Sequence, residues 1–99
     1  MKEPPWDLVV AGPTQRTIDR LPEKIAVAVL DFMLGPLLDN PHRVGTALRG
    51  ELTGLHSARV GTYRVVYEIH EADHMVRVVY VDHRADVYRP PLTSLKTPG

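Results

Sequence analysis

The sequence predicts an α+β fold, in which a helical hairpin packs on one face of a small antiparallel β-sheet in the order β-α-α-β-β-β. Apolar residues in the first half recur at the three- and four-residue steps of a helix, and the second half contains two runs rich in β-branched residues. The chain has 99 residues, 43% hydrophobic and 24% charged, which is typical of one globular domain. We expect this domain to span residues 1–89, followed by a Pro-rich C-terminal tail over residues 90–99.

The composition excludes several classes of site. There is no cysteine, so the chain has no disulfide, no thiolate zinc site and no cysteine nucleophile. Twelve Lys and Arg residues balance twelve Asp and Glu residues, so net charge alone indicates no nucleic-acid partner. No apolar run is long enough to span a membrane, and the N-terminal residues lack the apolar stretch of a secretion signal. We therefore expect a cytoplasmic protein without a membrane partner.

The first half predicts one strand and two helices. Residues 6–11 form a short β-branched run closed by a Gly-Pro pair, which is typical of a strand. Thr14 stands where a helix N-cap is expected, because its hydroxyl can accept a hydrogen bond from an unpaired backbone N–H. Pro22 lies inside the apolar helical pattern, where it would break a helix interior. We therefore expect two helices, over about 14–20 and 22–34, with Pro22 as the first residue of the second.

The second half predicts three strands. Residues 54–60 form a weak strand pattern, and residues 63–70 and 75–82 form strong ones. Gly61-Thr62 fits a two-residue hairpin turn with glycine first, and residues 71–74 form a polar loop.

The simplest register of the two hairpins separates the strand residues into two faces. It places Arg59 opposite Arg64, Glu68 opposite Arg77, and Arg64 opposite Val81. One face, expected to pack on the helices, gathers Tyr63, Val65, Tyr67, Ile69, Val76, Val78 and Tyr80. The other face gathers Arg59, Arg64, Val66, Glu68, His70, Arg77, Val79 and Val81.

The two opposed arginines raise the hypothesis of an anion site. Like charges directly opposite each other are destabilising, so a face that keeps Arg59 beside Arg64 is consistent with binding an anion. The alternative is that both long side chains extend separately into water. Alternation from Val81 places His83 on the same face and Arg84 on the core face. Because burying an unpaired guanidinium is prohibitive, we expect the strand to end, bulge or bend near this point.

Other kinds of site receive little support. The five histidines and the acidic residues show no recognised ligand spacing, so we expect no metal and no small-molecule cofactor. No nucleophile elbow surrounds a serine, and the glycines form no phosphate-binding loop.

Three segments are informative in combination: residues 48–54 (LRGELTG), residues 59–67 (RVGTYRVVY) and residues 83–89 (HRADVYR). In this order they resemble the RelE/ParE toxin superfamily, and the likeness covers roughly residues 14–89. The resemblance implies a compact sheet with a helical hairpin on one face, and membership in a type II toxin–antitoxin pair. The RelE branch implies an endoribonuclease that cuts mRNA in the ribosomal A site, and the ParE branch implies a non-nucleolytic inhibitor of DNA gyrase.

The resemblance also implies catalytic residues. Arg64 matches the sheet arginine that contacts the scissile phosphate in the RelE branch, and Arg84 matches a later active-site arginine. Tyr88 matches the tyrosine near the C-terminus of these enzymes. His83 matches no residue that all RelE-type enzymes share, although some relatives use a histidine near this end.

Basic residues outside this set are candidates for RNA binding. Arg59 and Arg49 lie where family members carry basic residues that bind RNA, and Arg43 is included with them. Neither the sequence nor the resemblance indicates a metal ligand.

These residues lead to a hypothesis of metal-independent RNA cleavage, in which a 2′-hydroxyl attacks the adjacent phosphate. Arg64 and Arg84 would stabilise the negative charge of the transition state, and Arg59 would hold a neighbouring phosphate. His83 or Tyr88 would transfer the proton. The expected partners are mRNA, the ribosome and a small acidic antitoxin, whose carboxylates would bind the arginines. The alternatives are a ParE-like gyrase inhibitor and a catalytically degenerate binding module.

Overall fold

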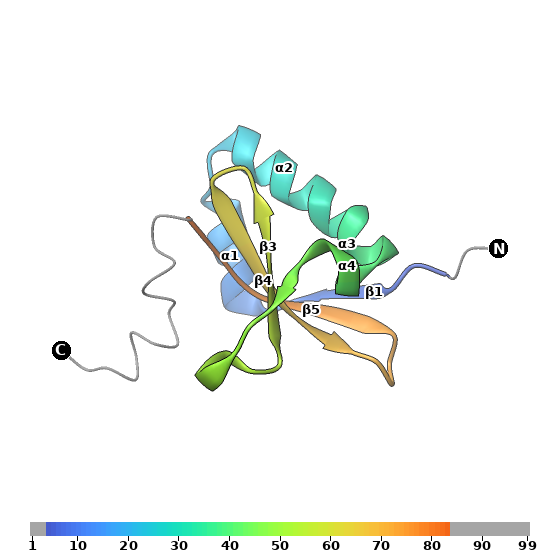
Figure 1. Cartoon of the computed structure of the whole chain (residues 1–99). Helices are drawn as coiled ribbons and strands as arrows, with labels where there is room; N and C mark the ends of the chain where they lie inside the picture. The colour runs from blue at the N-terminus through green and yellow to red at the C-terminus, as the bar shows by residue number, and fades with distance from the viewer. Residues whose placement is uncertain (1–3, 84–99) are drawn as a thin grey trace.

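The structure, a computed structural model, describes residues 4–83 and has the expected α+β class (Figure 1). Its elements are β1 (Asp7–Val10), α1 (Gly12–Asp19), α2 (Glu23–Leu34), α3 (Pro36–Asp39), α4 (Pro41–Val44), β2 (Thr46–Ala47), a 3₁₀ turn (Gly50–Leu52), β3 (Leu55–Val60), β4 (Tyr63–His70) and β5 (Met75–His83). The predicted domain boundary after residue 89 and the predicted tail over 90–99 lie outside the described residues.

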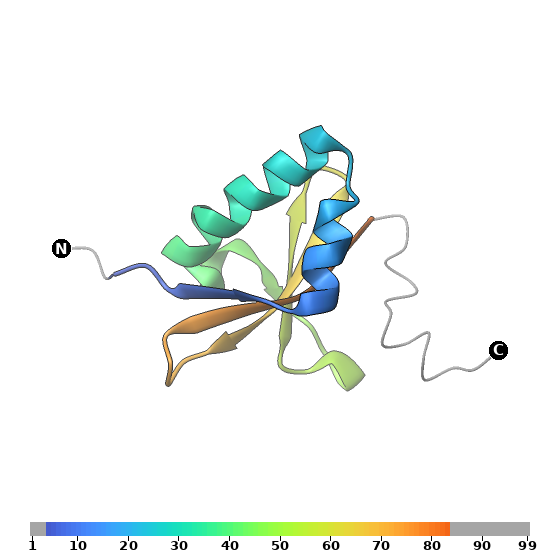
Figure 2. The ribbon, with the colours of Figure 1, turned by 180° about the vertical axis from the view of Figure 1, so that it is seen from behind.

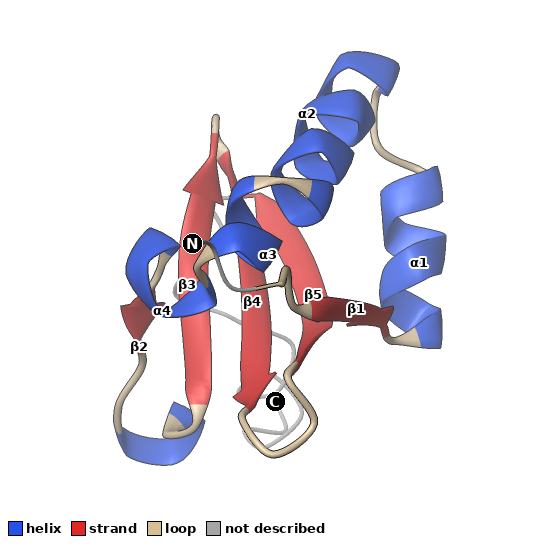
Figure 3. Ribbon diagram, turned by 90° about the vertical axis from the view of Figure 1, so that its right-hand side faces the viewer, coloured by secondary structure: helices blue, strands red, loops and turns tan. Residues whose placement is uncertain are grey.

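The strands form one five-stranded sheet in the order β1-β5-β4-β3-β2. Strands β3, β4 and β5 pair antiparallel, as the hairpin patterns predict. Strand β2, which the sequence analysis did not predict, pairs antiparallel with β3, and β1 joins β5 in parallel. Seen from behind, β1 runs beside β5 and leads directly into α1 (Figure 2). Helices α2, α3 and α4 lie over one face of the sheet, and α1 lies beside β5 (Figure 3).

The two main helices occupy nearly the predicted ranges, but their starts differ from the prediction. Helix α1 begins at Gly12, with Ala11 as its N-cap, so the prediction of Thr14 as N-cap is wrong. Pro22 is the N-cap of α2 and not its first residue. Both prolines next to these starts, Pro13 and Pro22, lie where a missing backbone N–H costs no helical hydrogen bond.

The core lies between the helices and the covered face of the sheet. It consists of the buried residues Trp6, Ile18, Val29, Met33, Leu37, Ala58, Val65, Tyr67, Val76, Val78 and Val81. Val81, predicted on the opposite face, is only 4% exposed in this core, and Tyr80, predicted to belong to it, is absent from it. The predicted alternation therefore fails along the second half of β5. None of the helices in residues 4–83 has the length and apolar character needed to cross a membrane.

A buried tyrosine attaches α4 to the sheet. The hydroxyl of Tyr67 donates a 2.7 Å hydrogen bond to the carbonyl of Pro41, and burial raises the pKa of Tyr67 to about 12. Gly45 follows α4 directly, and a Cβ at this position would overlap the Tyr67 hydroxyl and lie 2.9 Å from the carbonyl oxygen of Ser57. The glycine is thus required by close packing and not by its backbone dihedrals.

Histidines and a tryptophan join three segments at one end of the sheet. The Trp6 ring stacks on His74 with ring centroids 4.1 Å apart, and its centroid lies 5.8 Å from that of His42. The Nε2 atom of His42 lies 2.6 Å from Oε2 of Glu71 in the turn between β4 and β5. The ring of His56 lies edge-on to His42 at 6.3 Å. These contacts connect the start of β1, α4 and the β4–β5 turn.

The position of His56 predicts a loss of stability in acid. Burial, and secondarily the neighbouring His42, lower the pKa of His56 below its usual 6.5. The unfolded chain then takes up this proton before the folded chain does, so the His56 contribution is complete above pH 6.5 and is lost as the pH falls toward the folded pKa. His56→Phe keeps a ring beside Tyr67 and should reduce the loss of unfolding free energy between about pH 7.5 and about pH 5. Urea denaturation at both pH values measures this loss of unfolding free energy. The same loss in the variant and the wild type would contradict this account.

Candidate functional site

The face of β3 and β4 that is turned away from α2 carries Leu55, Ser57, Arg59, Arg64, Val66 and Glu68, and we call it the arginine face. The predicted pairing of β3 with β4 is confirmed: Arg59 lies opposite Arg64, and Val60 lies opposite Tyr63. Arg59 is exposed, whereas the Arg64 side chain is only 16% exposed. Two guanidinium groups of like charge therefore lie on neighbouring strands of one face.

The pairing of β4 with β5 changes register within the sheet. Glu68 pairs with Arg77 as predicted, and Tyr67 pairs with Val78. The next pair is Val66 with Tyr80, so Val79 is an extra residue that forms a β-bulge.

Because of the bulge, the strand partner of Arg64 differs from the predicted one. Arg64 pairs with Asp82 and not with Val81. A one-residue shift moves the following side chains of a strand to opposite faces, which explains why Val81 is in the core.

A side chain from α1 stabilises the bulge. The hydroxyl of Thr14 donates a 2.5 Å hydrogen bond to the carbonyl of Val79, and the backbone N–H of Ala11 donates to the carbonyl of Val78. Thr14 is buried, so an unpaired carbonyl here would lack both a strand partner and water. The threonine predicted to cap a helix therefore bonds to the irregular part of β5.

The bulge brings two residues to Arg64 that the sequence analysis missed as site residues, Tyr80 and Asp82. The Oδ1 atom of Asp82, whose side chain is 13% exposed, lies 3.8 Å from Nε of Arg64. Burial raises the pKa of Tyr80 above its usual 10.0, while among the neighbouring charges Arg64 lowers it and Asp82 raises it. Tyr80 therefore keeps its proton near neutral pH and can donate a hydrogen bond. Only the register reveals these neighbours, since nothing in the alternation of β5 marks the extra residue.

His83 does not join the arginine face. It pairs with Tyr63, whose side is opposite to that of Arg64, and the rings of Tyr63 and His83 meet edge-on with centroids 5.0 Å apart. The predicted placement of His83 beside Arg64 is therefore wrong, for the same reason that displaces Val81. Arg84 and Tyr88, the other two predicted catalytic residues, lie outside the described residues.

The predicted RNA-binding arginines do not all lie on the arginine face. Arg59 lies beside Arg64, whereas Arg43 belongs to α4, on the side of the sheet where Tyr67 bonds to Pro41. Arg49 is exposed and immediately precedes the 3₁₀ turn. The structure thus groups Arg59 and Arg64, and separates Arg43 from them.

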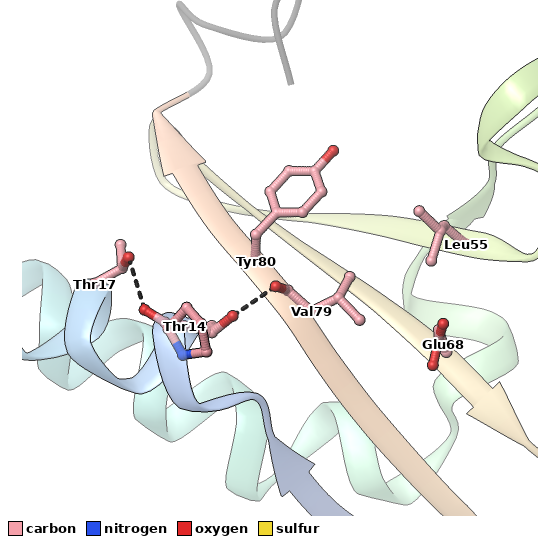
Figure 4. A pocket seen from close by; sticks show the side chains of 7 residues that line it. Thr14, Thr17, Leu55, Glu68, Val79 and Tyr80 are labelled. Atoms are coloured by element: carbon pink, nitrogen blue, oxygen red, sulfur yellow. Dashed lines mark hydrogen bonds between the residues drawn. The ribbon is translucent and has the colours of Figure 1, made fainter. Parts of the chain in front are cut away.

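A pocket of about 430 Å³ opens on the arginine face between α1 and the sheet. Figure 4 shows Thr14 and Thr17 of α1 on one side of Val79 and Tyr80, and Leu55 and Glu68 on the other. The lining residues are Pro13, Thr14, Thr17, Leu55, Glu68, Val79 and Tyr80. Within residues 4–83, no group of three His, Cys, Asp or Glu residues is arranged to hold a metal ion.

Comparison with known proteins identifies relatives over most of the chain. The family described as "ParE toxin of type II toxin-antitoxin system, parDE" matches residues 9–88. Toxin RelE of Mycobacterium tuberculosis is 48% identical over 85 residues, covering 86% of this chain and 88% of the relative. Toxin RelG of the same organism is 44% identical over 85 residues, covering 86% of this chain and 98% of the relative.

Solved structures show the same fold. The toxin–antitoxin complex RelBE2 from Mycobacterium tuberculosis contains a chain with a TM-score of 0.79 and 42% identity, covering 86% of this chain and 98% of that one. The archaeal RelE–RelB complex from Pyrococcus horikoshii gives a TM-score of 0.66 at 21% identity, covering 82% of this chain and 97% of that one.

The bulge contact predicts the effect of removing one hydroxyl. Thr14→Val keeps the shape of the side chain but leaves the Val79 carbonyl without its donor, so the free energy of unfolding should fall by about 1–3 kcal/mol. Thr17→Val is the matched control, because the Thr17 hydroxyl bonds to Pro13 on the exposed side of the same helix and its loss should cost about 0.5 kcal/mol or less. Urea denaturation of both variants measures the difference, and equal losses would show that the Thr14 bond does not stabilise the bulge.

Proposed function

The chain belongs to the ParE toxin family of type II toxin–antitoxin systems, and on this premise we propose that it is the toxin of such a pair and acts as an endoribonuclease on mRNA at the ribosomal A site. The observation that carries the proposal is the pairing of Arg59 with Arg64 on a sheet face that also holds Tyr80. Arg59 offers exposed positive charge to a phosphodiester, Arg64 adds a second guanidinium whose side chain is 16% exposed, and Tyr80 adds a buried hydroxyl.

The proposed reaction is the attack of a 2′-hydroxyl on the adjacent phosphorus, with departure of the 5′-oxygen. Negative charge grows on the non-bridging phosphate oxygens in the transition state. The Arg64 guanidinium stabilises this charge, and the loss of one such preorganised donor typically costs about 10²–10³ in rate. Arg59 binds the neighbouring phosphate. The products are a 2′,3′-cyclic phosphate and a 5′-hydroxyl.

Two proton transfers complete the reaction. The 2′-hydroxyl gives its proton to the Asp82 carboxylate, which lies beside Arg64. Tyr80, which burial keeps protonated, gives a proton to the departing 5′-oxygen. This assignment replaces His83, which lies on the other side of the sheet. Arg84 and Tyr88 stay predictions for the second arginine and a further proton donor.

The proposed partner is a small acidic antitoxin that covers the arginine face in the cytoplasm. Carboxylates form strong, often bidentate hydrogen bonds with guanidinium groups, so they would compete with RNA phosphates for Arg59 and Arg64. The relative at 42% identity was solved in the toxin–antitoxin complex RelBE2, which supports this partner class.

A second candidate is inhibition of DNA gyrase without nuclease activity. The matching family is described as that of the ParE toxin, which favours gyrase inhibition. The relatives at 44–48% identity are named RelE and RelG, which favours the nuclease. A gyrase inhibitor that cleaves no RNA does not require an arginine such as Arg64 beside a proton donor.

Replacing Arg64 tests the nuclease proposal directly. Arg64→Ala should lower the rate of RNA cleavage by about 10²–10³, because it removes the guanidinium that faces the transition state. Arg43→Ala makes the same charge change on the helix side and should leave the rate nearly unchanged. The assay follows end-labelled mRNA on programmed ribosomes and identifies the chemistry of both new ends. Products with a 5′-phosphate, or equal rates for both variants, would contradict the mechanism.

Inducible expression in bacteria separates the two candidates. Growth arrest accompanied by mRNA cuts within codons, abolished by Arg64→Ala and relieved by co-expression of the antitoxin, is the result expected of the nuclease. Arrest with damaged DNA and intact mRNA is the result expected of a gyrase inhibitor and would refute the nuclease proposal. Sequencing of mRNA 5′ ends and a DNA-damage reporter provide the two readouts.

A further inference from the structure

The outer side of α2 carries apolar side chains that the domain itself does not cover. Val27 is 51% exposed, Leu30 is 37% exposed and Leu34 is 64% exposed. Their spacing of three and four residues places them on one stripe of the helix, opposite the buried Val29 and Met33. Because α2 covers the face of the sheet opposite the arginine face, this apolar stripe lies on the other side of the molecule from the candidate RNA site (Figure 3).

Two exposed charged residues, Lys24 and Asp31, flank the apolar stripe on one side. They are seven residues apart, or about two helical turns, so their side chains follow one another along the helix. Neither forms an ion pair within residues 4–83. Lys24 lies in the first turn of α2 and Asp31 lies in the last, where each charge opposes the helix dipole. Within one molecule, this order of charges therefore makes the helix less stable than the reverse order would.

A second copy of α2, packed antiparallel, complements both the stripe and the two charges. A two-fold axis through the middle of the stripe brings Lys24 of each copy beside Asp31 of the other, and Val27 beside Leu30. Lys24 then lies near the negative C-terminal end of the facing helix, and Asp31 lies near its positive N-terminal end. The charge order that is unfavourable within one helix thus becomes favourable between two.

We propose that the outer side of α2 is the interface of a symmetric homodimer, in which two copies of this chain pack their α2 helices antiparallel. Both arginine faces point away from this interface, so the dimer presents two candidate RNA sites at once. The contact is limited to the 12 residues of α2 in each copy, which is smaller than the interfaces of about 1,200–2,000 Å² that stable complexes form. The association should therefore be reversible and depend on protein concentration.

The charges beside the apolar stripe favour a second copy over the acidic antitoxin. Glu23 and Asp31 are exposed next to the stripe, and Lys24 is the one base among the residues of α2. An acidic segment would gain one ion pair and meet two like charges, which disfavours the wrong partner. A second copy brings one base and one acid to each end of the contact.

The mass of the purified chain, measured by sedimentation equilibrium, tests the dimer. From micromolar to millimolar concentration the average mass should rise from that of one chain toward that of two. Val27→Glu should weaken this association at least about tenfold, because it places two like charges together near the axis. Val9→Glu is the matched control: Val9 is an exposed valine of β1, outside α2, and its replacement should leave the association unchanged. A chain that stays monomeric at every concentration, or equal effects of the two variants, overturns the proposal.

Reversal of the two charges tests the antiparallel arrangement. Lys24→Glu and Asp31→Lys should each weaken the association about threefold or more, because each replaces two attractive pairs by two repulsive ones. Each reversal moves the charge to the sign that the helix dipole favours, so a weaker helix cannot explain the loss. The double variant should regain the association of the wild type. If the double variant stays as weak as the single ones, Lys24 does not lie beside Asp31 of the other copy and the proposed packing is wrong.

Two further measurements separate this dimer from the other partners. Val27→Glu should leave co-purification with the antitoxin and the rate of RNA cleavage unchanged, and Arg64→Ala should leave the dimer unchanged. If the chain is monomeric and Val27→Glu weakens antitoxin binding, α2 docks the antitoxin and the proposal is wrong. A dimer that responds to Val27→Glu and to the charge reversals supports the proposal even if the chain cuts no RNA.

Discussion

The β-bulge at Val79 is the constraint on which the arrangement of the site depends. It moves Val81 into the core and places Tyr80 and Asp82 beside Arg64. The bulge persists because the Thr14 hydroxyl bonds to the Val79 carbonyl, so α1 stabilises the site as well as the sheet. A buried carbonyl that has no strand partner is costly, and a single threonine removes that cost.

The proximity of Asp82 changes the electrostatic description of the arginine face. A face with Arg59 and Arg64 alone would attract anions strongly, but the Asp82 carboxylate, 3.8 Å from Arg64, offsets part of that charge. The same carboxylate is the proton acceptor in the proposed reaction. Neutral net charge is consistent with this arrangement, because the proposed recognition of RNA then depends on a few placed groups and less on the attraction between net charges.

The sequence was sufficient to predict the fold and half of the strand register. The Gly61-Thr62 turn determines the β3–β4 pairing, so Arg59 opposite Arg64 followed from local information. The prediction of the β4–β5 pairing was wrong beyond Val78. The bulge there is stabilised by Thr14, which is 65 residues away in the chain. Alternation then misplaced Tyr80, Val81 and His83 together. The hairpin register placed Arg64 on the arginine face, as the structure has it, and its catalytic role stays a prediction from the family resemblance. The resemblance contained no information on Tyr80 or on the pocket beside it.

The most direct measurement of the central claim is the NMR response of arginine side chains to an RNA that carries 2′-O-methyl groups and therefore cannot be cleaved. If the arginine face binds the phosphodiester, the guanidinium signals of Arg59 and Arg64 and the ring signals of Tyr80 shift on titration, while those of Arg43 stay unchanged. Shifts confined to α4 and the helix side, with Arg64 unaffected, would show that RNA binds elsewhere and that the arginine face is not the site.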